Sequence, residues 1–289
     1  MPEKLKIGSV PYMNAWPLVH GLDERSDVAL RRDLPAALPQ LLRTGDVDAA
    51  MLPSIEYFRL AAEGLERARR AAAAGGLGGY VALPVAAIGS RGAVGSVMLF
   101  GFAEPDRLKR VLLDPASRTS NAMARVIVTR CLGSRPHFVL PEEIGPGQAR
   151  QPDAELVMGD RALSAERPQA KWVLDLGQEW DRLAHKPFIY AMWVARADGP
   201  LARLTDVLAE ARDRGLAARE ALADHGAQAL GISTDAARRY LLQQVRYGFG
   251  QKEQDGLRVF YRMAAEEGLA PDGVHLCVAR PAGATRSSP

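Results

Sequence analysis

The chain has 289 residues, 47% of them hydrophobic and 25% charged, which is the composition of a globular protein large enough to bury a core in two lobes. Its 37 basic and 34 acidic residues leave a formal net charge of +3, and because the basic residues are scattered along the chain, nucleic acid is not an expected partner. No run reaches the roughly 18 apolar residues of a membrane span and the first residues lack a signal-peptide core, so we expect a cytoplasmic monomer or homodimer without a membrane partner.

The first part of the chain alternates short apolar runs with segments of helical periodicity. Strands are predicted at residues 6–10, 48–52, 81–88, 94–100 and 110–114. One helix is predicted over residues 38–44, stopped by Gly45, and two others begin at Ser54 and Ser120. This alternation is typical of an α/β protein.

The second part adds three predicted strands, at residues 155–160, 171–176 and 188–195, and is almost wholly helical in periodicity from 201 to 269. If the β-rich stretches near Ser90 and Ala195 cross between lobes, the chain leaves one lobe, builds the other and returns. We therefore predict a two-lobed α/β clamp with a central cleft.

The predicted boundaries follow from these two crossings. Residues 1–91 plus 197–289 should form a discontinuous first lobe, and residues 92–196 the second. Residues 280–289, which are rich in small and polar side chains without apolar periodicity, should form a disordered tail.

The cysteines and histidines give no sign of a disulfide framework or a metal site. Cys131 and Cys277 lie far apart, each inside an apolar run, and we expect both to be buried thiols. None of the five histidines shows an H-x-x-x-H or similar spacing, and no G-x-S-x-G nucleophile elbow is present. We expect no metal, no cofactor and no covalent catalysis.

The strongest local signal is the stretch LDPASRTSNAMARVIVTRCLG, residues 113–133. A strand ends, a Ser/Thr-rich turn follows, and Ser120 occupies the expected N-cap of an amphipathic helix. Backbone N–H groups and the hydroxyls of Ser117, Thr119 and Ser120 would point to one place, which suits an anion. The alternative is that Ser120 only caps the helix.

Three other turns place polar groups at strand ends in the same way. Ser54 caps the helix after residues 48–52, and Glu56 in its first turn either faces a ligand or only complements the helix dipole. In the opening loop PYMNAWP, Asn14 can donate and accept hydrogen bonds beside the apolar wall of Tyr12, or it only closes the turn. Ser96, between a glycine and a buried strand, either faces the cleft or bonds to backbone.

These turns are expected to meet, because open α/β sheets bind ligands outside the carboxyl ends of their strands. Asp160, which closes the strand predicted at residues 155–160, belongs to the same set. The predicted site is polar and takes a small molecule.

Six blocks in order along the chain resemble the menaquinone-biosynthesis family of chorismate dehydratases, which open the futalosine pathway. The blocks are IGSVPYMNAWPL, GDVDAAMLPSIEY, GAVGSVMLF, LDPASRTSNAMARVIV, LVMGDRAL and LGQEWDRLAHKPFIYAMW. The resemblance covers about residues 5–265 and implies the type II periplasmic-binding-protein fold, a two-lobed clamp.

The resemblance also implies roles for individual residues. Asn14 and Ser96 match the family's active-site positions, in V-x-Y-x-N and G-x-V-x-S contexts, and Thr119 and Ser120 would line the cleft from the second lobe. One loop departs from the family pattern Thr-Gly-Leu-Pro-Phe, since residues 184–188 read Ala-His-Lys-Pro-Phe. The related 1,4-dihydroxy-6-naphthoate synthase opens with a different segment, so the PYMNAWPL loop argues against it.

The function that the resemblance implies is conversion of chorismate to 3-[(1-carboxyvinyl)oxy]benzoate by loss of water, with chorismate as the small-molecule partner. Helix N-termini at Ser54 and Ser120 would suit the two carboxylates of chorismate. The general base is either Glu56 or the enolpyruvyl carboxylate of the substrate itself. Two rivals from another class are a solute-binding protein for a small carboxylate and the sensing domain of a regulator, since fold does not determine function.

Overall fold

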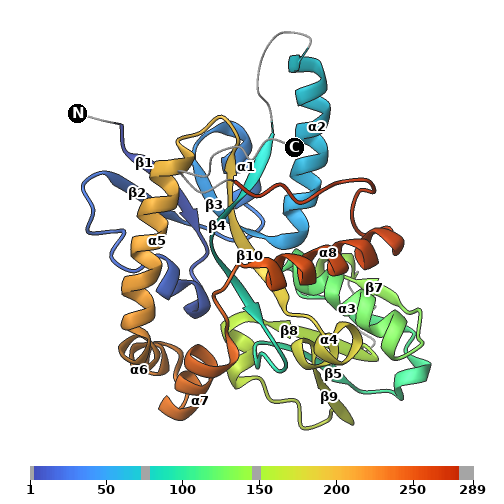
Figure 1. Cartoon of the computed structure of the whole chain (residues 1–289). Coiled ribbons are helices and arrows are strands. Elements are labelled where there is room, and N and C mark those ends of the chain that lie inside the picture. The colour runs from blue at the N-terminus through green and yellow to red at the C-terminus, as the bar shows by residue number, and fades with distance from the viewer. Residues whose placement is uncertain (1–2, 73–78, 145–150, 280–289) are drawn as a thin grey trace.

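The computed structural model describes residues 3–72, 79–144 and 151–279, and its strands form two five-stranded sheets, one in each lobe (Figure 1). In order across the first sheet lie β2 (Val28–Arg32), β1 (Leu5–Ser9), β3 (Ala49–Pro53), β10 (Phe188–Arg196) and β4 (Tyr80–Ser90). In order across the second lie β7 (His137–Val139), β6 (Arg110–Leu112), β8 (Ala154–Met158), β5 (Val97–Gly101) and β9 (Trp172–Asp175). The mixed α/β fold with two lobes is confirmed.

The chain passes between the lobes twice, next to the paired ends of β4 and β10. It leaves the first sheet after Ser90 and is back in it at Phe188, and these two residues are partners in the antiparallel pair of β4 and β10. The sequence predicts that the chain returns to the first lobe near residue 197, and this boundary is too late, because β10 pairs on both sides with strands of the first sheet. The apolar sequence of β10 does not indicate which of the two sheets the strand belongs to.

Helices cover both sheets, and the helical C-terminal part is confirmed. The α-helices are α1 (Leu38–Thr44), α2 (Ser54–Ala72), α3 (Arg118–Cys131), α4 (Leu176–Ala184), α5 (Leu201–Ala217), α6 (Arg219–Leu230), α7 (Thr234–Arg238) and α8 (Gln251–Glu266). The 3-10 helices are η1 (Met13–Leu18), η2 (Pro105–Arg107), η3 (Pro141–Glu143) and η4 (Gly159–Ser164), and η5 (Arg239–Gln244) is a π-helix. Within the described ranges, no helix is both long and apolar enough to cross a bilayer.

Several local expectations differ from the structure. The N-cap of α3 is Ser117 rather than Ser120, because the Ser117 hydroxyl accepts the Ser120 backbone N–H at 3.1 Å. Cys131 and Cys277 are exposed rather than buried: Cys131 ends α3, and Cys277 lies near the C-terminal end of the described chain, where its backbone N–H donates to the Tyr57 hydroxyl. The tail predicted at residues 280–289 lies outside the described residues.

The opening segment folds as η1, and two glycines of the C-terminal helices pack closely against it. A Cβ atom at Gly215 of α5 would lie 1.9 Å from the Pro17 carbonyl oxygen, and one at Gly226 of α6 would lie 2.5 Å from the Met13 sulfur. Both contacts are closer than van der Waals distance, and because the Gly215 contact is with backbone, which cannot move aside as the Met13 side chain can, α5 needs glycine there to approach η1. The segment that carries Asn14 is thereby packed as part of the first lobe.

Candidate active site

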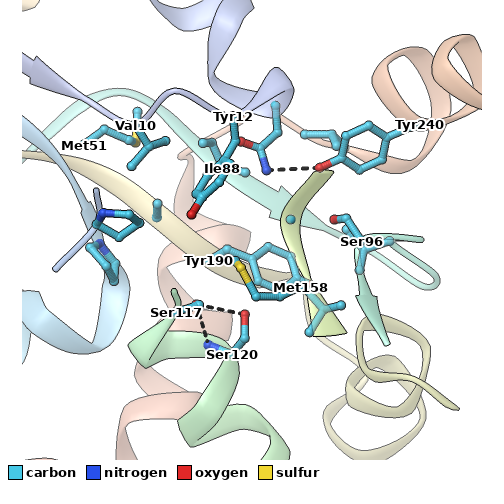
Figure 2. A pocket seen from close by; sticks show the side chains of 18 residues that line it. Val10, Tyr12, Met51, Ile88, Ser96, Ser117, Ser120, Met158, Tyr190 and Tyr240 are labelled. Atoms are coloured by element: carbon cyan, nitrogen blue, oxygen red, sulfur yellow. Dashed lines mark hydrogen bonds between the residues drawn. The ribbon is translucent and has the colours of Figure 1, made fainter. Parts of the chain in front are cut away.

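A pocket between the lobes collects side chains from the ends of strands of both sheets (Figure 2). Its lining consists of Val10, Tyr12, Asn14, Pro35, Met51, Pro53, Ile88, Val94, Ser96, Val97, Ser117, Ser120, Met158, Gly159, Tyr190, Ala191, Tyr240 and Val245. The space inside is about 50 Å³, well below the roughly 300–1,000 Å³ of ordinary ligand pockets. A ring-sized ligand therefore needs more room than the pocket has in this conformation.

Asn14 lies in the pocket and is oriented by a residue from the other end of the chain. Its Nδ2 donates to the Tyr240 hydroxyl at 3.0 Å, the bond drawn to Tyr240 in Figure 2. Its Oδ1 is buried and has no hydrogen-bond partner among the described residues. Because an unsatisfied buried acceptor costs about 1–3 kcal/mol, this oxygen is suited to receive a donor from a ligand.

Ser96 lies in the pocket wall, where the loop before it is held by a single carboxylate. Asp175 at the end of β9 accepts the backbone N–H groups of Val94 and Gly95, at 2.9 and 2.6 Å from Oδ2, and those of the first turn of α4. Gly95 has φ +73°, a left-handed conformation that favours glycine, and the Gln244 side chain packs 2.8 Å from the position of a Cβ there. This loop geometry presents the Ser96 hydroxyl to the cleft.

The Ser/Thr turn before α3 also reaches the pocket. The Ser117 and Ser120 hydroxyls lie 3.0 Å apart and both line it (Figure 2). Asp114, at the end of β6, holds the turn by accepting the Ala116 N–H at 2.9 Å and links it to β8 by accepting the Met158 N–H at 3.1 Å. The Ser120 N–H is capped by Ser117, and the first-turn N–H groups before it have no acceptor within the helix, so the turn is suited to an anion.

Three residues of the predicted set lie behind this lining. The Ser54 hydroxyl donates to the Ile189 carbonyl at 2.7 Å, and the adjacent Ile55 N–H donates to the Thr119 hydroxyl at 3.3 Å, so the start of α2 is occupied by the protein itself. Glu56 is buried and paired with Arg59 and, at 3.6 Å, with Arg118. The structure therefore brings Asn14, Ser96, Ser117, Ser120 and Tyr12 together, and leaves Ser54, Glu56 and Thr119 behind them.

Asp160 links the two lobes. Its carboxylate accepts the Met13 backbone N–H at 3.2 and 3.3 Å, which ties η4 of the second lobe to η1 of the first. Burial raises the pKa of Asp160 to about 6, against the lowering effect of this hydrogen bond. Burial, with the charges of Asp114 and Asp160, raises the pKa of the neighbouring Tyr12, which stays neutral at physiological pH.

We expect Asp160→Asn to stabilise the free protein at pH 7.5 by about 1–2 kcal/mol, less than the full cost of a two-unit shift because the side chain is partly exposed. Above pH 6 the folded state keeps a carboxylate that would be better hydrated after unfolding, so Asp160 destabilises it there. As the pH falls from about 6 towards 4, the folded state takes up the proton first and this cost disappears. Melting temperatures of both proteins between pH 4.5 and 7.5 should converge at the acid end, and a constant difference would contradict the assignment.

No charged side chain lines the pocket in the part of the chain that the structure describes. Nor do three or more His, Cys, Asp or Glu side chains of the described residues gather into a group that could hold a metal ion. An anionic ligand would therefore be held by hydroxyls, an amide and helix N–H groups.

Sequence reasoning missed Tyr240, Tyr190 and Asp175. Tyr240 and Tyr190 line the pocket, and Tyr190 shares a hydrogen bond with Ser90 at 3.1 Å beside the first crossing. The sequence signals for these residues are weak. Tyr240 lies in a segment of helical periodicity, Tyr190 lies in a buried strand, and Asp175 has the pattern of a helix N-cap. Of the three, only Asp175 lies at the end of a predicted strand, the position at which the other site residues were predicted.

The loop that departs from the family pattern lies away from the pocket lining. His185 ends α4 with φ 52°, the only positive φ of a non-glycine residue in the described part of the chain. The family pattern has glycine at this position, as expected for a left-handed helix C-cap. The departure therefore changes the C-terminal end of α4. It does not change any side chain that lines the described pocket.

Comparisons with known proteins agree on family and fold. The chain matches the family described as menaquinone biosynthesis over residues 5–266. A chorismate dehydratase from Thermus thermophilus is 30% identical over 271 residues, which cover 88% of this chain and 93% of that protein.

Solved structures show the same two-lobed architecture. A protein of Archaeoglobus fulgidus superimposes with a TM-score of 0.66 at 15% identity, covering 92% of this chain and 98% of that chain. The periplasmic aliphatic sulphonate binding protein of Escherichia coli superimposes with a TM-score of 0.62 at 17% identity, covering 100% and 96%. At such identities the likeness shows the fold alone, which is that of periplasmic binding proteins.

Proposed function

The chain belongs to the menaquinone-biosynthesis family, and on that premise we propose that it is a chorismate dehydratase, a hydro-lyase that forms 3-[(1-carboxyvinyl)oxy]benzoate as the first step of the futalosine route. The relative that shares 30% of its residues over most of both chains carries that name, which supports the same reaction here. The proposal includes a cytoplasmic location, because chorismate is an intermediate made inside the cell.

The observation that carries the proposal is the pair of polar groups, one from each lobe, that line an uncharged pocket. Asn14 offers a buried, unpartnered amide oxygen, and Ser96 offers a hydroxyl from the opposite lobe. A substrate with a ring hydroxyl to lose satisfies both when the lobes close on it. The apolar floor of Met51, Ile88 and Ala191 suits a six-membered carbon ring.

The reaction needs little from the protein beyond geometry and charge stabilisation. A proton leaves C3 of chorismate, the electron pair forms a ring double bond, and hydroxide departs from C4, so that one water is released and the ring becomes aromatic. Aromatisation supplies the driving force. Asn14 and Ser96 would orient the substrate and assist the leaving hydroxyl by hydrogen bonding, the kind of positioning that lowers a barrier without covalent chemistry.

The proton acceptor that fits best is the enolpyruvyl carboxylate of the substrate. No His, Lys, Asp or Glu lines the described pocket. Glu56 is held in ion pairs behind α3, and the carboxylate of Asp160 is bonded to the Met13 N–H. A carboxylate carried by the substrate meets the ring proton at fixed distance once the lobes have closed.

The test is incubation of the purified protein with chorismate while its ultraviolet spectrum is followed. Catalytic appearance of an aromatic product, identified by mass as chorismate less one water, is the expected result. The rival that the binding-protein fold keeps open is a protein that binds a small carboxylate without converting it. Saturable binding of chorismate with no turnover would favour that rival and overturn the proposal.

We expect binding of a substrate carboxylate to depend on the backbone at the start of α3 more than on its hydroxyls. Arg118→Pro removes one first-turn N–H at the helix position that tolerates proline, and should weaken binding of chorismate by about 1.5–3 kcal/mol. Ser120→Ala removes a neutral hydrogen bond and should cost only about 0.5–1.5 kcal/mol. Both are measured by calorimetric titration of an unreactive chorismate analogue.

The control for the proline variant is Arg118→Ala, which loses the same ion pair with Glu56, 3.6 Å long, but keeps the N–H. Equal affinities of Arg118→Pro and Arg118→Ala would show that this N–H holds no carboxylate. Loss of binding in Ser120→Ala with the fold intact would make the hydroxyl the anchor.

A further inference from the structure

Tyr240 lies in the pocket with Asn14 and Ser96, although it belongs to a helix and not to one of the turns at strand ends. It is the second residue of the π-helix η5 and is 0% exposed. Its hydroxyl receives the Asn14 Nδ2 at 3.0 Å across 226 positions of sequence. The Ser96 side chain of the second lobe lines the same pocket and lies close enough to the phenol to lower its pKa.

We propose that Tyr240 is a positioning residue of the dehydratase, whose phenol oxygen orients the Asn14 amide and the Ser96 hydroxyl towards the substrate. This inference rests on the proposed function and deepens it. Tyr240 acts through these two residues, and it neither takes nor gives a proton in the reaction.

The hydrogen-bonding capacity of the three groups supports this arrangement. A phenol has one donor and two acceptor sites. Because Tyr240 accepts from Asn14 Nδ2, its own proton remains to be donated. In the proposed arrangement Ser96 receives it, and the Ser96 proton is then free for the leaving hydroxyl. The Asn14 Oδ1 remains an acceptor without a partner among the described residues, on a side chain that lines the pocket.

The neutral state of Tyr240 is consistent with positioning. Burial raises the pKa of Tyr240 far above the ordinary value of a tyrosine, and the contacts with Ser96 and Asn14 lower it only in part. The phenol therefore keeps its proton at physiological pH. A residue that cannot ionise can still hold its neighbours in one orientation.

The backbone around Tyr240 fits the same role. The Val245 N–H donates to the Tyr240 carbonyl at 3.0 Å, the i to i+5 bond of a π-turn, and π-helical turns are frequent at functional sites. The same segment places Gln244 against Gly95, next to Ser96. The widened turn thus brings one segment to Asn14 on one side and to the Ser96 loop on the other.

The decisive comparison is Tyr240→Phe against Tyr247→Phe. Tyr247 is a buried tyrosine seven positions on, outside the pocket lining, whose hydroxyl has no partner among the described residues. We expect Tyr240→Phe to lower kcat for chorismate about tenfold or more, with KM changed less than kcat. Tyr247→Phe should stay within about twofold of wild type, and equal kcat values for the two variants would overturn the inference.

A double-mutant cycle separates positioning from a structural role. In the Asn14→Ala background the amide that Tyr240 orients is gone, so Tyr240→Phe should lower kcat by a smaller factor than in the wild type. A factor that is the same in both backgrounds would show that Tyr240 does not act through Asn14.

Failure of the proposed function would be seen separately, as no conversion of chorismate by the wild-type protein. Exchange of the Asn14 side-chain amide protons, assigned by their absence in Asn14→Ala, tests the inference without substrate. The exchange should be slow in wild type and in Tyr247→Phe, and faster in Tyr240→Phe. Slow exchange that persists in Tyr240→Phe would overturn the positioning role whatever the result with chorismate.

Discussion

Asn14→Asp should lower both the affinity for chorismate and kcat, and their combined loss should be at least about a hundredfold. A carboxylate at this position faces a doubly charged substrate in a pocket without a lining cation among the described residues. Two like charges 4 Å apart repel by about 4 kcal/mol at an effective dielectric constant of 20, more than the roughly 1 kcal/mol of a lost neutral hydrogen bond.

The change also reverses the contact with Tyr240. The Nδ2 donor that now reaches the phenol at 3.0 Å is replaced by an acceptor. In the arrangement proposed above, the phenol proton then turns towards the introduced carboxylate and is no longer donated to Ser96. Steady-state kinetics should therefore show a kcat effect as well as a binding effect, because two groups lose their orientation together.

Two controls make the result interpretable. Asn14→Ala should keep the melting temperature and lose mainly turnover, since it removes the amide without adding charge. The Asn14→Asp variant should recover part of its activity as the pH is lowered, because protonation removes the charge. Activity of Asn14→Asp close to wild type would make Asn14 a turn residue and would move the search for the active site elsewhere in the cleft.

Gly215→Ala should destabilise the protein by about 1–3 kcal/mol, the usual cost of overpacking a core. Glycine to alanine in a helix normally stabilises by about 0.5–1 kcal/mol, so the predicted sign is the reverse of the helix propensity. The reason is the Pro17 carbonyl oxygen, 1.9 Å from the position of the new Cβ. Backbone cannot rotate away as a side chain can, so α5 and η1 must move apart.

The same variant should lower turnover although Gly215 does not line the pocket. Pro17 ends the loop that carries Asn14, and displacement of this loop would misalign the amide with Tyr240, an error that can cost about a hundredfold in rate. Urea denaturation and chorismate turnover measure the two effects. Gly248→Ala is the control, because its new Cβ would meet nothing closer than 3.6 Å. A Gly215→Ala protein more stable than wild type would refute this account of the packing.

The order of the elements and several polar turns could be predicted from the sequence. The alternation of apolar runs and helical periodicity predicted the strands and helices that frame the cleft closely enough to place Asn14, Ser96, Ser117 and Ser120 at strand or helix ends. These features depend on residues within one or two turns of each other, and such local patterns are recorded directly in the sequence.

Only the tertiary structure decided which of these ends open into the pocket. The first turns of α2 and α3 have similar sequence patterns. In the structure, however, the Ile55 N–H donates to the Thr119 hydroxyl of the facing helix at 3.3 Å, whereas Ser117 lines the pocket. Tyr240 meets Asn14 across 226 positions, and Gly215 makes room for Pro17. Such contacts depend on how two lobes and a C-terminal group of helices pack together, and no periodicity within one segment encodes the partner that another segment will bring to it.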